Sequence, residues 1–254
     1  MIFITGDIHG DPTRFSMENF PEQKEMTKDD YMIILGDFGL VWNCGLESKE
    51  EKYWLKWLEE KPFTTLFIDG NHENHDRLDA YPVEIWKCGK VHFIRPSVIH
   101  LMRGQVFHID DLSFFTFGGA RSHDISAGIL DPEDPDFRKK KRMLDRDHVF
   151  YRVKRRSWWE REMPSEEEMQ EGIVNLKKEG NKVDYILTHC TYNALLPQLD
   201  GGAGMYKKDY LSDYFQEIKQ TVDFKHWLFG HFHVNKTFQW EKASCLYEQI
   251  IRIA

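Results

Sequence analysis

The chain contains 254 residues, of which 41% are hydrophobic and 30% are charged, and its formal net charge is -8. This length and apolar content provide a sizeable core without disulfides, which excludes a disulfide-stabilised mini-protein. No apolar run approaches the roughly 20 residues of a membrane-spanning helix, and no basic or apolar leader precedes the first strand, so we expect a cytoplasmic protein without membrane contact.

The first 70 residues predict alternating strands and helices. Apolar strands are expected at residues 2–5, 31–35 and 64–68. An Asp-Pro pair predicts the start of a short helix over residues 11–20, which carries two phenylalanines. A capping-box pattern at residues 48–51 opens a second helix, which Pro62 ends.

From residue 83 the pattern changes to short segments rich in β-branched and aromatic residues. These predict antiparallel strands and hairpins at residues 91–94, 98–101, 106–109 and 112–117. The charged stretch that follows has no steady period, and we expect an insertion or lid at about residues 121–164. Because no Pro/Gly/Ser-rich linker divides the chain, this insertion is expected to belong to a single domain of residues 1–254.

The last third returns to alternating helices and strands. Helices are predicted from Ser165 to about Lys178 and over residues 209–220, and strands at residues 185–188 and 226–229. The tail is expected to pair as strands around residues 237–240 and 244–251. Taken together, the elements predict an α/β fold.

Potential metal ligands directly follow five of the predicted strands. The five strand ends read Gly6-Asp7-Ile8-His9-Gly10, Gly36-Asp37, Gly70-Asn71-His72-Glu73, His189 and Gly230-His231-Phe232-His233. Any one of these residues alone is more often a cap, a turn or a structural histidine. In open α/β sheets, however, the loops beyond the carboxyl ends of the strands converge on one crevice. The joint placement therefore predicts a shared metal site.

The residue types fit two divalent cations. Asp7, His9, Asp37 and His233 form a set for one ion, and Asp37, Asn71, His189 and His231 form a set for the other. Asp37 would bridge the two ions with its two carboxylate oxygens. In sites with two ions about 3.5 to 4 Å apart, the metals generate hydroxide at neutral pH and stabilise both ends of an in-line displacement. The neutral amide and imidazoles leave net positive charge for a phosphate.

The ordered series Asp-x-His, Gly-Asp, Gly-Asn-His-Glu, lone His and Gly-His-x-His resembles the calcineurin-like metallophosphoesterases, in particular bacterial and phage phosphatases. This resemblance spans residues 6–233 and implies an α/β fold of two mixed sheets packed as a sandwich between helices. It implies a dinuclear centre with these seven metal ligands: Asp7, His9, Asp37, Asn71, His189, His231 and His233. It also implies that His72 contacts the phosphate and protonates the leaving oxygen, a role that an ordinary imidazole pKa near 6.5 would suit.

Some positions depart from the protein serine/threonine phosphatase branch of this family. Leu40, Val41 and Asp69 stand where that branch has an Asp and two phosphate-binding arginines. The missing positive charge is predicted to come from Arg121 or from the basic run at residues 138–142. For that run a solvated surface is the slightly favoured interpretation, because charge runs usually face water. The tryptophans at residues 158 and 159 stack on a base in one interpretation and pack in the core in the commoner one.

The predicted function is hydrolysis of phosphate esters by a metal-bridging hydroxide. Asp37 and His72 are the predicted catalytic residues, and Asn71, His72 and Arg121 are predicted to contact the substrate, a phosphorylated small molecule or nucleotide. Two divalent ions are expected, from manganese, iron, zinc or cobalt. The alternatives are a nuclease or cyclic-nucleotide phosphodiesterase, with nucleic acid less favoured as substrate, and, less favoured again, a non-catalytic metal-binding scaffold. No obligate protein partner is indicated.

Overall fold

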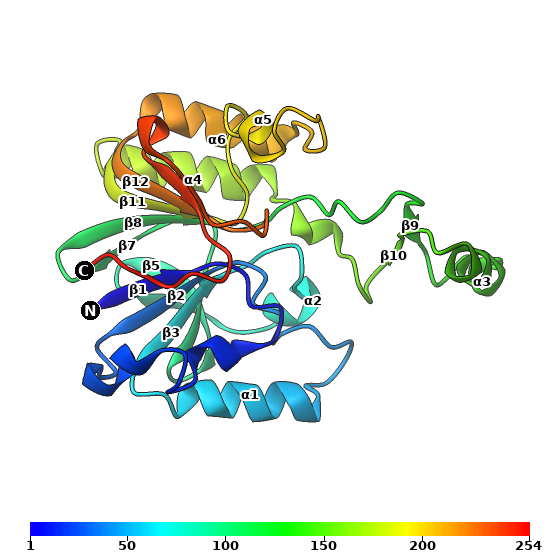
Figure 1. Ribbon diagram of the computed structural model, residues 1–254, viewed down its shortest axis with the longest axis horizontal. Helices are drawn as coiled ribbons and strands as arrows, with labels where there is room; N and C mark the ends of the chain where they lie inside the picture. The colour runs from blue at the N-terminus through cyan, green and yellow to red at the C-terminus, as the bar shows by residue number, and fades with distance from the viewer.

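Strand-forming segments from the whole length of the chain assemble into two mixed sheets in the computed structural model, which describes residues 1–254. The sheets face each other, and helices cover both outer faces (Figure 1). This arrangement confirms the predicted α/β sandwich. None of the helices has both the length and the apolar character needed to cross a membrane.

The first sheet contains the strands predicted in the first 70 residues. Its seven strands are, in spatial order, β15 (Ile251–Arg252), β1 (Ile2–Thr5), β2 (Tyr31–Leu35), β3 (Thr64–Ile68), β6 (Val98–Leu101), β5 (Gly89–Arg95) and β4 (Val83–Trp86). The four strands β1, β2, β3 and β6 run parallel to one another, so their carboxyl ends reach the same edge. The predicted bounds of β1, β2 and β3 are confirmed.

The second sheet contains strands from the middle and the end of the chain. Its six strands are, in spatial order, β13 (Lys236–Phe238), β14 (Ala243–Cys245), β12 (Asp223–Phe229), β11 (Lys182–Thr188), β8 (Leu112–Phe117) and β7 (Gln105–Ile109). The expected antiparallel pairs occur between β5 and β6 and between β7 and β8. However, β6 and β8 also pair in parallel with β3 and β11, because each hairpin extends a parallel sheet.

Three helices agree with the predicted ones and cover the outer faces of the sheets: α1 (Lys49–Glu59), α4 (Glu166–Lys178) and α6 (Tyr210–Thr221). Two helices of four residues each, α2 (His75–Leu78) and α5 (Leu196–Leu199), were not predicted. Capping boxes start α1, α4 and α6. The short helix expected over residues 11–20 is instead two 3-10 turns, Pro12–Phe15 and Pro21–Glu25, because each proline starts a turn of its own. Two more 3-10 turns lie at Glu160–Glu162 and Gln239–Glu241.

The hydrophobic core has three parts. One cluster, which includes Ile4, Leu66 and Leu187, fills the space between the two sheets. A second packs the outer face of the first sheet against α1, and a third packs the outer face of the second sheet against α4 and α6. β1, β2 and β3 are buried along their whole length, and β11 and β12 are buried over their last three residues, so the carboxyl ends of all five strands are held in place by packing.

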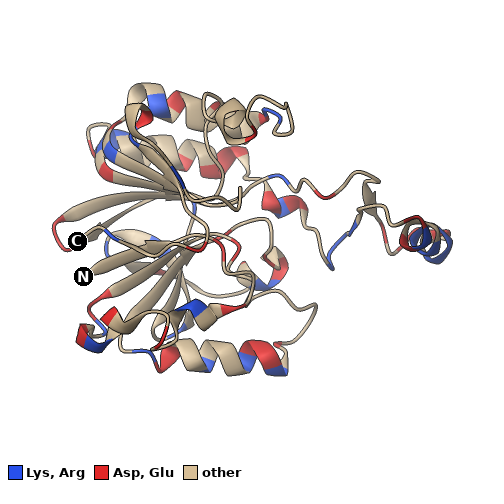
Figure 2. Ribbon diagram, in the orientation of Figure 1, with Lys and Arg blue, Asp and Glu red and all other residues tan.

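Residues 121–164, here called the arm, extend away from the two sheets (Figure 1). The arm contains β9 (Ile129–Leu130), α3 (Phe137–Asp147) and β10 (Arg152–Val153), and its two strands pair only with each other. No residue of α3 is buried. Lys and Arg gather on this helix (Figure 2), which agrees with a solvated interpretation of the basic run. The short parallel strands of the arm were not predicted.

The tail differs from the expected strand pair. β13 and β14 pair antiparallel as predicted, but Trp240 lies in the 3-10 turn between them and is fully exposed. Residues 246–250 form no strand, because the chain there crosses to the other sheet, where β15 pairs with β1.

Candidate metal centre

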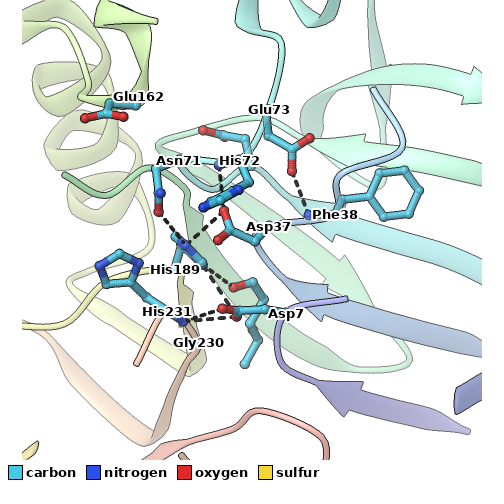
Figure 3. Close-up of polar contacts among 12 residues, drawn as sticks. Asp7, Asp37, Phe38, Asn71, His72, Glu73, Glu162, His189, Gly230 and His231 are labelled. Atoms are coloured by element: carbon cyan, nitrogen blue, oxygen red, sulfur yellow. Dashed lines mark hydrogen bonds and ion pairs between the residues drawn. The ribbon is translucent and has the colours of Figure 1, made fainter. Parts of the chain in front are cut away.

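The predicted ligands lie at one edge of the sandwich, where the parallel strands of both sheets end. Three of these strands, β1, β2 and β3, belong to the first sheet, and β11 and β12 belong to the second. Figure 3 shows side chains from the loops after these strands pointing toward one another. The structure therefore brings together residues that are more than 220 positions apart in the sequence.

Two groups of potential ligand atoms share one carboxylate. Asp7, His9, Asp37 and His233 form one group, and Asp37, His189 and His231 form the other, with the ligand atoms in each group within 4.8 Å of one another. Asp37 is common to both groups. The amide oxygen of Asn71 lies 3.3 Å from Nε2 of His189, which places Asn71 beside the second group. These are the two sets of side chains predicted from the strand ends, although their binding of metal stays a prediction.

The backbone at this edge is held in unusual conformations. Four of the seven predicted ligands have a positive φ: His9 at 46°, Asp37 at 44°, His231 at 70° and His233 at 51°. Such left-handed conformations are uncommon for residues with a side chain and persist only where the surroundings enforce them. Here the amide of His9 donates to the carbonyl of Asp37 at 2.8 Å, and the amide of His231 donates to Asp7 Oδ1 at 3.0 Å. Hydrogen bonds between the loops therefore stabilise these left-handed conformations.

Two glycines allow the carboxylates to come close to the neighbouring loops. A Cβ on Gly70 would lie 2.1 Å from Oδ1 of Asp37, and a Cβ on Gly230 would lie 2.2 Å from Oδ1 of Asp7. Any side chain at these positions would push a carboxylate out of its place. The glycines of the predicted motifs are therefore required by contact and not only by the turns they make.

The electrostatics of the edge favour a bound cation. Burial disfavours ionisation of Asp37, but the positive charge and hydrogen bond of His189 hold the pKa of its carboxyl well below the usual range. Burial would keep His189 neutral, yet Asp37 and Asp7 raise the pKa of His189 to about 9. In the bare chain a proton on His189 therefore offsets one of the two negative charges of the aspartates. A divalent metal ion supplies the same compensation, so the residues present fit a metal centre.

Two pairs of histidine side chains place their ring nitrogens within hydrogen-bond distance of each other. Nε2 of His9 lies 2.9 Å from Nε2 of His233, and Nε2 of His123 lies 2.7 Å from Nε2 of His231. Two neutral imidazoles in this arrangement share one proton at most, whereas a cation satisfies both lone pairs. The first pair joins two predicted ligands. The second brings in His123, which the sequence interpretation left out.

His72 occupies a different environment from the one assumed for it. Burial, opposed by Asp37 and assisted by Arg152, lowers the pKa of His72 to about 4. The ordinary value near 6.5 therefore does not hold, and the imidazole is neutral at pH 7. Its ring stacks on Trp42 with 5.6 Å between centroids, and its Nε2 lies 2.8 Å from Nη2 of Arg152.

Glu73 holds the backbone beside Asp37 in place. Its carboxylate accepts a hydrogen bond of 2.7 Å from the amide of Phe38, the residue after Asp37. The amide of His72 in turn donates to Oδ1 of Asp37 at 2.8 Å. The two loops that follow β2 and β3 are therefore linked at the centre of the site (Figure 3).

The structure adds residues of the arm that the sequence did not single out. Arg152 contacts His72 and pairs with Asp124 at 2.7 Å. Both lie in the segment expected to form a lid, and no local signal distinguishes Arg152 from the basic residues on either side of it. Arg121 is exposed, and its neighbours Ser122 and His123 reach Asn71 and His231. This places Arg121 at the rim of the site, and its contact with substrate stays a prediction.

Trp159 contributes to the wall of the site and not to an exposed stacking surface. It is buried, donates from Nε1 to Asp76 at 3.0 Å and packs edge to face on Trp42. Trp158 is half-buried and lines a cleft of about 550 Å³ together with Arg155 and Arg156. For Trp159 the core-packing interpretation is therefore confirmed.

Comparison with known proteins agrees with the geometry. The family described as calcineurin-like phosphoesterase matches residues 1–235. Lariat debranching enzyme A of Xenopus laevis is 27% identical over 150 residues, which are 54% of this chain and 27% of that protein. The chain thus covers about a quarter of that relative. The solved phosphopantetheinyl hydrolase of Mycobacterium tuberculosis aligns with a TM-score of 0.42 and 12% identity, covering 97% of this chain and 87% of the other.

Proposed function

The chain belongs to the calcineurin-like phosphoesterase family, and from this premise we propose that it hydrolyses phosphate esters with two divalent metal ions held where its two sheets meet. The observation that carries the proposal is the position of Asp37. Its carboxylate belongs to both groups of potential ligand atoms and is 2% exposed. A single buried carboxylate with two such neighbourhoods is suited to bridging two cations.

We propose that seven ligands are divided between the two ions. Asp7, His9, Asp37 and His233 hold one ion, and Asp37, Asn71, His189 and His231 hold the other. When bound, two such ions activate a water molecule and neutralise the charge of the phosphate. The ligand set lacks thiolate, so manganese, iron, zinc and cobalt are the metals to test.

We assign His72 to the substrate phosphate. It directly follows Asn71, and its neutral ring offers one proton for a hydrogen bond to a phosphoryl oxygen or to the leaving oxygen. Because the pKa of His72 is lowered to about 4, a positively charged imidazole is scarce at pH 7. Because Nε2 accepts from Arg152 in this structure, the proton of the departing alkoxide comes from water, or from His72 after its ring has taken up a second proton.

We further propose that residues 1–254 form one metallophosphoesterase domain with the arm at the rim of its site. The substrate class that we favour is a phosphorylated small molecule or nucleotide. A phosphodiester in a nucleic acid is the alternative, and it is favoured by the exposed basic helix α3 and by the partial likeness to a lariat debranching enzyme.

Metal binding and hydrolysis together test this function. Calorimetric titration with Mn²⁺, Fe²⁺, Zn²⁺ and Co²⁺ should give two bound ions per chain, and a panel of phosphomonoesters, phosphodiesters and nucleotides should identify the substrate class. Asp37→Asn should weaken both metal sites and lower kcat/KM by at least about 1,000-fold, since it removes the shared ligand. Asp223→Asn, at the exposed far end of β12, is the matched control.

Two results would contradict the proposal. If Asp37→Asn retained two ions with wild-type affinity, Asp37 would not be the bridge. If the wild-type chain bound two ions but hydrolysed none of the esters in the panel, the scaffold alternative would be the better description.

A further inference from the structure

One basic residue of the arm is buried, unlike the basic residues next to it. The side chain of Arg152, on β10, is only 7% exposed, whereas the neighbouring Lys154, Arg155 and Arg156 are exposed to solvent. Its Nη2 lies 2.8 Å from Nε2 of His72. The guanidinium of Arg152, which lies near the end of the insertion, thus contacts the histidine that follows the predicted metal ligand Asn71.

The guanidinium of Arg152 is anchored on three sides. Its Nε donates to Oδ1 of Asp124 at 2.8 Å, Nη2 lies 2.7 Å from Oδ2 of Asp124, and Nη1 donates to the carbonyl of Ser157 at 2.9 Å. The pairing of β10 with β9 sets its backbone. A fork held in this way loses little further freedom when it binds an anion, and the remaining Nη2 hydrogen is directed at the site.

The surroundings of the Arg152 guanidinium favour a phosphate as its ligand. His72 is confined by its stack on Trp42, and its Nε2 is the acceptor that the Nη2 hydrogen of Arg152 meets in this structure. Val41 and Asp69 stand where the serine/threonine phosphatases that this chain resembles have phosphate-binding arginines. Asp69 is instead buried in an ion pair with Arg103 and cannot contact substrate.

We propose that Arg152 binds the phosphate of the substrate, and that Asp124 is the positioning residue that orients it. This inference rests on the proposed phosphoesterase function and makes the arm a part of the site. On substrate binding, a phosphoryl oxygen takes the place of Nε2 of His72 as the acceptor of the Nη2 hydrogen. Asp124 keeps its contact with Nε throughout.

The test compares phosphate affinity with metal affinity. In Arg152→Met, the inhibition constant of inorganic phosphate and KM for a phosphomonoester should each rise at least tenfold, while the number of bound metal ions and Tm stay unchanged. Arg152→Lys keeps the charge but not the fork, and should recover part of the loss. Arg146→Met, on the exposed face of α3, is the matched control and should change neither constant.

Asp124→Asn tests the positioning role separately. It should raise the inhibition constant of phosphate less than Arg152→Met does, and the double variant should be no worse than Arg152→Met alone, because Asp124 acts through Arg152. Unchanged phosphate inhibition in Arg152→Met and in Arg152→Lys would overturn the inference. A loss in Arg121→Met combined with no loss in Arg152→Met would move the phosphate contact to Arg121.

Failure of this inference differs from failure of the proposed function. If the inference alone fails, the wild-type enzyme binds metal and hydrolyses esters, and the Arg152 variants behave as it does. If the function fails, the wild type itself lacks metal binding or hydrolysis. In the second case, titration of inorganic phosphate into the wild type and Arg152→Met still measures the contribution of Arg152 to anion binding.

Discussion

The sandwich edge and the arm contribute to the candidate site in different ways. At the edge, buried strands from both sheets end together, and seven predicted ligands converge because the core leaves their loops no alternative position. The arm has little core of its own, α3 buries nothing, and the arm reaches His72 through Arg152. Packing therefore determines the positions of the predicted metal ligands, whereas a few polar contacts connect the arm to them.

Among changes outside the predicted ligands, the largest effect is expected from adding a single methyl group at the edge. In Gly70→Ala the new Cβ would lie 2.1 Å from Oδ1 and 2.4 Å from the amide nitrogen of Asp37, so the bridging carboxylate must move. We expect loss of at least one bound metal ion and a fall in kcat/KM of about 100-fold or more, measured by calorimetry and steady-state kinetics.

A second glycine provides the control for this prediction. Gly180 has a φ of 66° and nothing within 4 Å of an added Cβ, so Gly180→Ala meets backbone strain without any clash at the site. It should lower the free energy of unfolding by about 1 kcal/mol and leave metal binding intact. Equal metal binding by Gly70→Ala and the wild type would show that the edge tolerates movement of Asp37.

An intermediate effect on stability is expected when the pH is lowered. It arises from a histidine in the first sheet and not from the arm. Burial and the neighbouring His100 lower the pKa of His92 from 6.5 to about 4. Between these values the unfolded chain binds a proton that the folded chain does not, so the free energy of unfolding falls as the pH falls. The full shift corresponds to about 3 kcal/mol, present above pH 6.5 and lost by about pH 4.

Replacement of this histidine isolates its contribution. His92→Asn can keep a polar atom near Nδ1 of His100, which now lies 3.1 Å from Nδ1 of His92, but it does not titrate. Denaturant unfolding in the presence of chelator, repeated across this pH range, should show a shallower decline for His92→Asn than for the wild type. Parallel declines would mean that His92 is as easily protonated in the folded chain as in the unfolded one.

The smallest effect is expected from α3. Because this helix buries no residue, the triple variant with Lys139, Lys140 and Lys141 changed to Gln should shift Tm by no more than about 1 °C. Its kcat/KM for a small phosphomonoester should stay within about twofold of the wild-type value. If a polynucleotide is hydrolysed instead, the variant should lose much of the salt dependence of KM, which would make the arm a nucleic-acid contact.

Much of the fold was predictable because local signals agree with tertiary packing. The bounds of β1, β2 and β3 and the capping boxes of α1 and α4 follow from apolar runs and from Ser-x-x-Glu patterns that act over a few residues. The paths of the tail and of the short strands in the arm were not predictable. β9 and β10 contain two residues each, and β15 pairs with a strand about 250 positions earlier. Such short strands show no hydrophobic period in the local sequence from which they could be predicted.

The sequence by itself determined the family, through the order of its five motifs. It also predicted which side chains meet at the sandwich edge, because polar residues at the ends of buried parallel strands have only one edge at which to meet. Tertiary structure alone decided which positive charge faces His72. An arginine carries no sign of its partner in the local sequence, and 80 residues separate Arg152 from His72. The pKa of His72 was likewise decided by burial and by that neighbour, since ionisation depends on charges and solvent that only the folded chain brings into place.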